Sequence, residues 1–402
     1  MTTQTKPPKI LLVTAHCPHG EVYGGQLRTL NIARVLNQCG TLEIVLFPFG
    51  PLSEEALNAS RDEFSIRKVF YFSQPSSSSL FARLKREFHP YAADTEAKRL
   101  SKVDENEMFQ IASEYDLIWF QGIAIPNCLG RARWPNSILD IDDVPSQCFM
   151  GKAKEARNHK DRLMAFRKVA QWKRREKVFL NRFSVMAVCS EQDRDLFGGS
   201  DRVCVIPNGF DAPASEPVRK PPSFPCIGFI GTFQYTPNVE GIRWFVDKVW
   251  PLILEQRPDV RLRLVGTGTE HGVGGHESNI DGLGFVTDSE SEIATWTLMI
   301  VPILVGGGTR IKIAEAFSRG CPVVSTNQGA YGYQIQNGRE CVLADEACDF
   351  AKGCLILIED PIACDAMIQR ARTMFDRELD WKAIAPKITR TIEVALNQKN
   401  LV

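Results

Sequence analysis

The chain has 402 residues, of which 44% are hydrophobic and 24% are charged, a composition typical of an ordinary globular protein. Its length is comfortable for two domains and too long for one of typical size. Lys plus Arg and Asp plus Glu both number 48, so the net charge is zero, which argues against bulk nucleic-acid binding.

The twelve cysteines are scattered, without CxxC or zinc-finger spacing. In a chain of this length they indicate reduced thiols in a cytosolic protein. The N-terminus, MTTQTKPPKI, lacks the apolar core of a signal peptide. No run of roughly 18 apolar residues is present, so we expect no membrane-spanning helix. The expected location is the cytoplasm, with peripheral contact to the inner face of a membrane as an option.

The first half of the chain alternates strand-like and helical patterns. The strands are rich in Ile, Val and Leu on both faces, as in a covered parallel sheet. Helical stretches lie between them, over 25–37 and 157–181, and this alternation predicts βαβ units. The predicted strands cover 10–15, 42–47, 69–72, 117–120, 138–141, 185–188 and 203–206.

A proline-rich segment, DAPASEPVRKPPSFP over residues 211–225, follows and predicts a linker. The alternation then restarts. The predicted strands cover 226–230, 261–265, 280–285, 298–302 and 322–325, and the predicted helices cover 238–249, 289–295, 309–319 and 381–396.

The pattern predicts an α/β protein with two doubly wound, Rossmann-like domains that face a central cleft. Ligands in such folds bind at the carboxyl ends of the strands. We expect a first domain over 1–210, the linker over 211–225, a second domain over 226–380 and a final helix over 381–402.

The most distinctive segment is VPILVGGGTRIKIAEAFSRGCPVVSTNQG, residues 301–329. It predicts a buried strand, a triple-glycine loop, a helix with Thr309 as its N-cap, and a second strand. Arg310 and Lys312 fall in the first turn, where the positive end of the helix dipole disfavours cations. Glycines, exposed N–H groups and two cations predict a phosphate or diphosphate site. The alternative is a surface helix with a Lys312–Glu315 pair.

The pattern GGGTRIKIAEAFSRGCPVVST resembles the donor-nucleotide motif of the retaining GT-B glycosyltransferases, the glycosyl transferases group 1 or family 4 class. In that family a Glu-x7-Glu pair brackets the segment, and the second Glu, here Glu315, holds the ribose hydroxyls. The first Glu, which approaches the donor sugar, would fall at Gly307 and is absent. The family's early Arg and Lys, which neutralise the diphosphate, are also missing from 231–245, so we assign that role to Arg310 and Lys312.

Further matches follow in the family's order over 205–395. They are Pro207-Asn208-Gly209 before Asp211, GFIGT at 228–232, VGTG at 265–268, Gly284-Phe285-Val286 before Asp288, and Trp381 at the start of the last helix. The resemblance implies donor contacts from Gly231, Thr232, Val286, Gly307, Gly308 and Thr309 in addition to the cations and Glu315. It implies no cofactor and no metal, because the nucleotide sugar is a co-substrate.

The first domain offers candidates after two of its predicted strands. Tyr23, Gly24 and Gly25 open a helix whose N-terminus favours a diphosphate, or form a plain strand-to-helix turn. Asp142 and Asp143 follow the strand 138–141, and either carboxylate could orient or deprotonate the acceptor hydroxyl. A helix cap or a loop ion pair is the structural alternative. Asp140, inside that strand, is expected to be structural, and Gln121, His16 and His19 are weaker candidates for the cleft.

Residues 152–182 are rich in Lys and Arg, and one helical face, with Leu163, Phe166 and Val169, is apolar. One interpretation is a solvated helix that covers the sheet. The other is a surface that meets anionic lipid or a phosphate-bearing acceptor.

The sequence therefore predicts a glycosyltransferase that moves a sugar from a nucleotide-diphosphate sugar to an acceptor hydroxyl, with retention implied by the resemblance. The product would be a polysaccharide, a glycolipid or a glycoside, and the acceptor a saccharide, a lipid-linked saccharide or a small molecule. A nucleotide-sugar epimerase of the same fold and a non-catalytic nucleotide-sugar-binding protein remain as alternatives.

Overall fold

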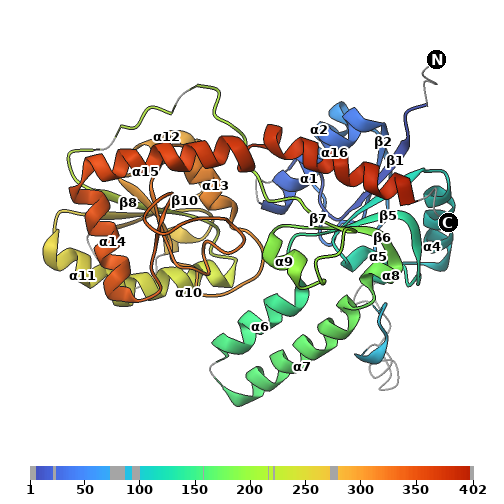
Figure 1. The fold of residues 1–402 in the computed structure, drawn as a ribbon, viewed down its shortest axis with the longest axis horizontal. Helices are drawn as coiled ribbons and strands as arrows, with labels where there is room; N and C mark the ends of the chain where they lie inside the picture. Colours follow the sequence, from blue (N-terminus) through green and yellow to red (C-terminus); the bar gives the residue numbers. More distant parts are fainter. Residues whose placement is uncertain are drawn as a thin grey trace. The chain divides into compact units, whose positions relative to one another are not determined.

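The computed structural model describes residues 6–20, 24–72, 87–92, 100–156, 158–215, 217–220, 222–271 and 279–398 (Figure 1). The chain divides into two compact units. Unit 1 comprises Met1–Pro207 together with Ile384–Val402, and unit 2 comprises Asn208–Ala383.

Unit 1 is built on a seven-stranded sheet in which every pairing is parallel, in the order β3-β2-β1-β4-β5-β6-β7. The strand order reverses between β1 and β4, which makes their carboxyl ends the position where such sheets bind ligands. The strands are β1 (Lys9–Thr14), β2 (Thr41–Leu46), β3 (Ile66–Val69), β4 (Leu117–Gln121), β5 (Trp134–Ile141), β6 (Phe183–Val188) and β7 (Val203–Val205).

Helices connect these strands, as the parallel pairing requires. Ser53, Ser101, Asn158 and Ser190 cap α2, α4, α7 and α9 with their side chains. The helices are α1 (Gly24–Cys39), α2 (Glu54–Glu63), α4 (Lys102–Ser113), α5 (Ala124–Cys128), α6 (Pro145–Glu155), α7 (His159–Glu176), α8 (Phe179–Arg182) and α9 (Glu191–Asp195).

Unit 2 repeats the design with a six-stranded parallel sheet in the order β10-β9-β8-β11-β12-β13. Its order reverses between β8 and β11. The strands are β8 (Cys226–Ile230), β9 (Arg261–Val265), β10 (Ile280–Gly284), β11 (Leu298–Val301), β12 (Val323–Ser325) and β13 (Val342–Leu343).

Apolar side chains pack on both faces of this sheet and are fully buried along β8, β9 and β11. The last helix, α16, starts at Trp381, as the sequence indicated, and continues into unit 1. The helical elements are α10 (Thr236–Trp244), η1 (Phe245–Val249), α11 (Trp250–Gln256), η2 (Thr269–His271), α12 (Ser289–Ala294), α13 (Ile311–Ser318), α14 (Ala347–Glu359), α15 (Pro361–Met374), η3 (Phe375–Leu379) and α16 (Trp381–Gln398).

The proline-rich residues 211–225 fall in unit 2 and are attached to it. The Arg219 guanidinium donates to the carbonyls of Trp296 and Thr297 at 2.8 and 2.7 Å, and Ser318 Oγ donates to the carbonyl of Asp211 at 2.8 Å. The described residues of the proline-rich segment therefore pack as part of unit 2.

Two predicted elements of unit 1 are wrong in their limits. The strand expected over 69–72 is β3, Ile66–Val69, because its hydrogen-bonding partner β2 ends at Leu46, opposite Val69. The single helix expected over 157–181 is α7 followed by the short α8, and Arg157 lies outside the described residues. Among the described residues no helix has both the length and the apolar content to cross a bilayer.

Candidate active site

The triple-glycine loop of unit 2 connects β11 to α13. Gly306 and Gly308 adopt φ values of +121° and +69°, which side chains rarely tolerate. A Cβ on Gly306 would also lie only 2.4 Å from Nη2 of Arg310. Gln328 Nε2 donates to the carbonyl of Gly306 at 2.7 Å and fixes the loop. The glycines therefore let the Arg310 guanidinium lie directly against the backbone.

Arg310, not Thr309, occupies the N-cap position of α13, and it makes no side-chain capping bond. The prediction of Thr309 as N-cap is wrong because the loop stays extended for one more residue. Tyr333 Oη donates to the carbonyl of Arg310 at 2.8 Å and holds this turn. The other end of α13 agrees with the sequence, since Gly320 follows the last turn with φ +64° and Cys321 N–H donates to the carbonyl of Ala316.

Lys312 crosses from α13 to the loop that follows β8. Its Nζ donates to Oδ1 of Asn238 at 2.9 Å and lies 4.0 Å from the centre of the Phe229 ring. A Cβ on Gly231 would be 2.9 Å from that Nζ. Lys312 thus places its ammonium in the 231–245 region, where the sequence has no clear Arg–Lys pair.

The electrostatics of Lys312 are unfavourable in the free protein. Removal from water, together with repulsion by Arg310, lowers the pKa of Lys312 to about 7, although Glu315 opposes the shift. An anion beside this ammonium would reverse the effect.

Two polar atoms beside these cations have no partner among the described residues. Thr309 is 6% exposed, and its buried Oγ1 makes no hydrogen bond there; the same holds for Nε of Arg310. A buried polar group without a partner costs on the order of 1–3 kcal/mol. These two atoms are therefore available to a group outside the described residues.

Glu315 lies on α13 one turn after the cations and is 8% exposed. Burial raises the pKa of Glu315, and Arg319 partly offsets this. Ser289 Oγ donates to Oε1 of Glu315 at 3.2 Å, and Ser289 follows the N-cap Asp288 of α12. The expected ribose contact, Glu315, thus lies beside the end of the Gly284–Asp288 segment, which contains the expected donor contact Val286.

The remaining donor candidates lie in the same unit, around the β8/β11 reversal. Gly307 is buried, and Val286 is half-buried in the apolar cluster beneath the sheet's carboxyl end. Thr232 Oγ1 donates to the carbonyl of Thr267 at 3.4 Å, and the carbonyl of Thr232 accepts from Asn238 Nδ2 at 2.8 Å.

Sequence reasoning missed three residues of this cluster: Phe229, Tyr235 and Asn238. A Cβ on Gly306 would lie 3.3 Å from the Tyr235 hydroxyl, which therefore lies near Arg310. The available signal was the Thr-Pro-Asn run at residues 236–238, which opens α10 after the short loop 231–235 that follows β8.

The candidates of unit 1 gather after β1 and β4. Gly24 and Gly25 are the first residues of α1, while Tyr23 lies outside the described residues. A Cβ on Gly25 would be 3.4 Å from Nε2 of His16, and burial lowers the pKa of His16. Gln121 donates to the carbonyl of Gly25 at 3.3 Å and accepts from the hydroxyls of Thr14 and Thr29 at 2.7 and 2.6 Å. Gln121 therefore ties the sheet to the start of α1.

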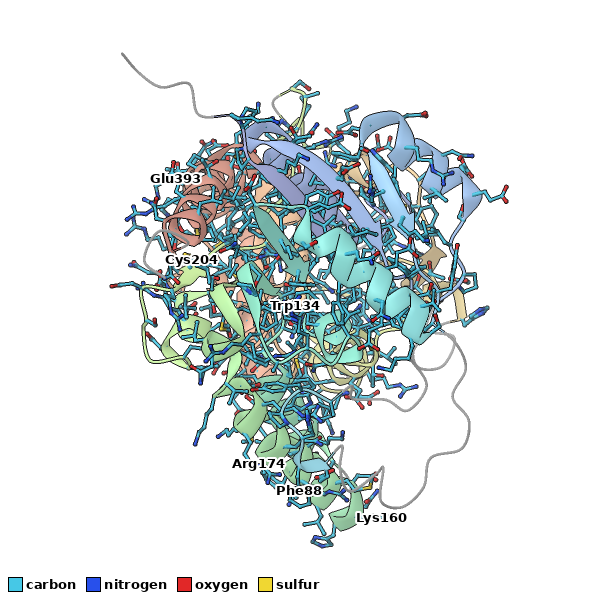
Figure 2. The ribbon with its side chains drawn as sticks, turned by 90° about the vertical axis from the view of Figure 1, so that its right-hand side faces the viewer. Phe88, Trp134, Lys160, Arg174, Cys204 and Glu393 are labelled. Atoms are coloured by element: carbon cyan, nitrogen blue, oxygen red, sulfur yellow. The ribbon has the colours of Figure 1, made fainter. Side chains whose placement is uncertain are left out.

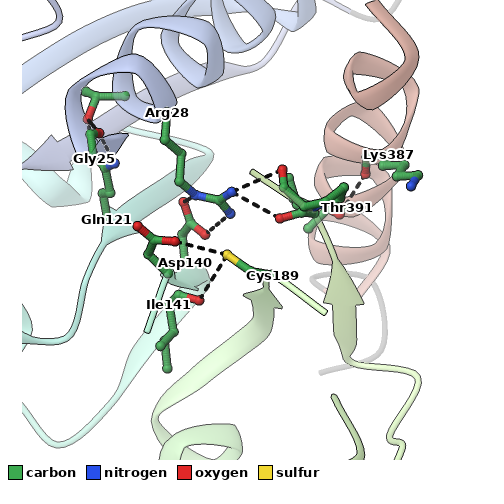
Figure 3. A network of polar contacts seen from close by, with 12 residues as sticks. Gly25, Arg28, Gln121, Asp140, Ile141, Cys189, Lys387 and Thr391 are labelled. Carbon is green, nitrogen blue, oxygen red and sulfur yellow. Dashed lines mark hydrogen bonds and ion pairs between the residues drawn. The ribbon is translucent and has the colours of Figure 1, made fainter. Parts of the chain in front are cut away.

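A fully buried ion pair lies next to this region (Figure 3). Arg28 donates from Nη2 and Nε to Asp140 at 2.6 and 3.1 Å, and from Nη1 to the carbonyl of Ile206 at 3.0 Å. Both side chains are 0% exposed. Burial alone would lower the pKa of Arg28, but Asp140 outweighs it and the pKa is raised. Asp140 is structural, as expected.

Asp142 and Asp143 lie between β5 and α6. The Cys189 thiol donates to Oδ1 of Asp142 at 3.2 Å, and burial raises the pKa of that thiol. Asp143 is exposed. The N-cap of α6 is Val144, so neither aspartate caps this helix, which removes one structural alternative. No group of three or more His, Cys, Asp or Glu side chains suited to a metal occurs in the described part of the chain.

Comparison with known proteins gives three kinds of likeness. Residues 224–360 match the family model for glycosyl transferases group 1. An uncharacterised 44.6 kDa protein from the cps region of Klebsiella pneumoniae is 24% identical over 374 residues, covering 86% of this chain and 89% of that protein.

Two solved structures show the same fold. HepE from Anabaena, crystallised with UDP and glucose, has a TM-score of 0.62 at 19% identity and covers 96% of this chain and 99% of its own. Sucrose-phosphate synthase from Thermosynechococcus elongatus has a TM-score of 0.66 at 14% identity, covering 98% of this chain and 99% of its own. The chain therefore has the GT-B fold, and its residues 224–360 are similar to the glycosyl transferases group 1 family.

Proposed function

We propose that this protein transfers a sugar from a nucleotide-diphosphate sugar to an acceptor hydroxyl, with retention of configuration at the anomeric carbon. Unit 2 binds the donor and unit 1 the acceptor. The observation that carries the proposal is the cluster at the β8/β11 reversal. There Arg310, Lys312 and the Thr309 hydroxyl, which has no partner in the described part of the chain, lie on a glycine loop and a helix N-terminus.

A diphosphate satisfies each unusual feature of this cluster. A guanidinium binds phosphate oxygens in a bidentate manner, and an ammonium adds a point charge. The two cations lie one turn before Glu315, so a nucleotide with its diphosphate on Arg310 and Lys312 offers its ribose hydroxyls to that carboxylate. The base then meets the backbone of Gly284–Val286. HepE was crystallised with UDP-glucose, which favours a uridine nucleotide as the first donor to test.

The transfer breaks the bond between the anomeric carbon and the diphosphate oxygen and forms a bond from that carbon to the acceptor oxygen. The electron pair of the broken bond stays on the diphosphate, and the acceptor proton passes to a leaving phosphate oxygen. Preorganised donors at such a developing charge contribute about 3–4 kcal/mol each to transition-state stabilisation. Arg310, Lys312 and the N–H groups of Gly307, Gly308 and Thr309 supply this stabilisation.

In unit 1, Asp143 is the better candidate to orient the acceptor because its side chain is exposed, whereas Asp142 already accepts from Cys189. Gly24 and Gly25 present the N-terminus of α1 to the substrates. The product is a polysaccharide, glycolipid or glycoside, formed at a cytoplasmic location.

A thermal-shift screen of UDP, GDP and ADP sugars tests the proposal, because a ligand that binds the native state raises its melting temperature. We expect one nucleotide series to stabilise the wild type, and Arg310→Ala and Glu315→Ala to remove most of that shift. Lys248→Ala is the control, because Lys248 is an exposed side chain of η1. Asp288→Ala would not serve as a control, because Asp288 caps α12.

Detection of free nucleoside diphosphate, released faster when an acceptor is added, then establishes transfer. Full donor stabilisation in both Arg310→Ala and Glu315→Ala would show that the site is wrong. Binding without turnover against a broad acceptor set would favour a non-catalytic binding protein instead.

A further inference from the structure

We propose that the exposed face of α7, together with Phe88, docks this protein onto an anionic membrane surface. The proposal concerns unit 1 alone and does not depend on the donor site. It rests on the exposure, the angular order and the charge of side chains on the α6–α7 hairpin.

α6 and α7 pack along each other as an antiparallel hairpin (Figures 1 and 2). Figure 2 shows Phe88, Arg174 and Lys160 together along this hairpin, apart from the core residue Trp134. One face of α7 is buried, with Ala165, Val169 and Trp172. The buried face already satisfies the packing needs of the helix, so its outer face is not required for the core.

That outer face carries large apolar side chains in contact with water. Leu163 is 71% exposed, Phe166 46% and Met164 57%, and Phe88 beside the helix is 68% exposed. The sequence left open whether this apolar face covers the sheet or forms an interaction surface, and in the structure Leu163 and Phe166 are exposed. A group of exposed apolar residues on one helix marks an interaction surface.

The angular order of the residues is that of an interfacial helix. At 3.6 residues per turn, Leu163, Phe166 and Ala170 form one strip along the outer face. Arg162 and Lys173 fall on one side of the strip, and Lys160, Arg167 and Arg174 on the other; all are exposed. An apolar strip with cations on both flanks suits a helix that lies in the plane of a bilayer surface.

The charged side chains on and beside α7 indicate which lipid headgroups this face would bind. Of the acids on α7, Asp161 is exposed but lies away from the strip, and Glu176 is buried. Glu87 pairs with Arg167 at 2.9 Å, which neutralises one cation, while the Arg174 guanidinium lies 5.4 Å from the centre of the Phe88 ring. Since the remaining cations lie beside exposed apolar groups, the face complements anionic phospholipid headgroups with acyl chains beneath them.

Vesicle flotation with the full-length protein tests the proposal. Vesicles of phosphatidylcholine alone are compared with vesicles of equal parts phosphatidylcholine and phosphatidylglycerol. We expect the wild type to float with the anionic vesicles only, and rising salt to weaken this binding. Lys173→Gln/Arg174→Gln should lower the partition about 30-fold, since each cation near such a surface contributes about fivefold. Leu163→Ser/Phe166→Ser should lower it at least about tenfold.

Matched controls come from unit 2. Arg243→Gln/Lys248→Gln removes two exposed cations, and Ile362→Ser removes an apolar side chain that is 84% exposed. Both controls should float like the wild type, and unchanged melting temperatures in the hairpin variants show that they fold. Equal flotation with both vesicle types, no flotation at all, or hairpin variants that float like the controls would each overturn the proposal. Loss of UDP stabilisation in an Arg310 variant has no bearing on it.

Discussion

A fully buried arginine in unit 1 and two half-buried cations in unit 2 have opposite kinds of surroundings. In unit 1, Arg28 is enclosed by Asp140 and two backbone carbonyls, so its charge is neutralised within the protein. In unit 2, Arg310 and Lys312 lie side by side, and neither forms an ion pair with a carboxylate in the described part of the chain. We therefore regard the completed pair as structural and propose the incomplete cluster as the binding site for the donor.

Arg28→Ala should produce the largest change in stability. It leaves Asp140 buried without a partner, which costs about 3–5 kcal/mol in the free energy of unfolding of unit 1. Urea denaturation followed by circular dichroism measures the loss. The double variant Arg28→Met/Asp140→Leu should recover most of it, and a mild effect of Arg28→Ala would show that the pair is not structurally essential.

Arg310→Ala should have the reverse profile. We expect a loss of about 100- to 1,000-fold in kcat/KM for transfer, the usual cost of removing one donor to a developing charge. The free energy of unfolding should hardly change, since the guanidinium makes one 3.4 Å bond to the carbonyl of Val305 and leaves Nε without a partner in the described residues. Initial-rate kinetics measure the expected loss of kcat/KM, and urea denaturation of the same sample measures the free energy of unfolding. A large stability loss would place Arg310 with Arg28 as a structural residue.

Gly306→Ala sharpens the comparison by moving Arg310 without removing it. The new Cβ meets Nη2 of Arg310 and forces a strained φ, so we expect a stability loss of about 1–3 kcal/mol and weaker donor binding. Gly338→Ala is the control, because Gly338 has φ +75° with nothing within 4 Å of an added Cβ. If the two variants have similar stability and only Gly306→Ala binds UDP more weakly, the loss of binding comes from the steric effect on Arg310. Equal UDP binding by both variants would contradict this explanation.

The pH dependence of donor binding should show whether Lys312 is the group that titrates. With its pKa lowered to about 7, its side chain loses its charge as the pH rises above 7. A diphosphate binds the charged form, so binding then requires proton uptake, and the Kd should weaken by up to about tenfold per pH unit above pH 7. Calorimetric titration of UDP into the wild type and Lys312→Arg measures this difference. The arginine variant stays charged, so an identical pH slope in both proteins would exclude Lys312 as the titrating group.

The sequence predicted the strand, glycine loop and helix of the proposed donor segment well because most of that signal is local. Three glycines, two cations and Glu315 fall within one loop and one helix, so spacing alone places them together. The reach of Lys312 to Asn238 and Phe229 could not be predicted, because it joins segments more than 70 residues apart through side-chain packing. The sequence left the orientation of Leu163 and Phe166 undecided for a related reason, since α7 has apolar residues on both faces and only the fold decides which face is buried.

The central claim is that Arg310 and Lys312, which form no ion pair with a carboxylate among the described residues, bind a diphosphate. Lys312→Met tests this claim most directly. The pKa of Lys312 is lowered from 10.5 to about 7, so between these pH values the folded state binds fewer protons than the unfolded state. Lys312 therefore destabilises the folded protein fully below pH 7, and this destabilisation disappears as the pH approaches 10.5. At pH 7 the account predicts that the free variant melts at a higher temperature than the wild type, whereas UDP, GDP and ADP no longer stabilise it. A variant that melts lower than the wild type and still shows the full nucleotide shift would contradict the account.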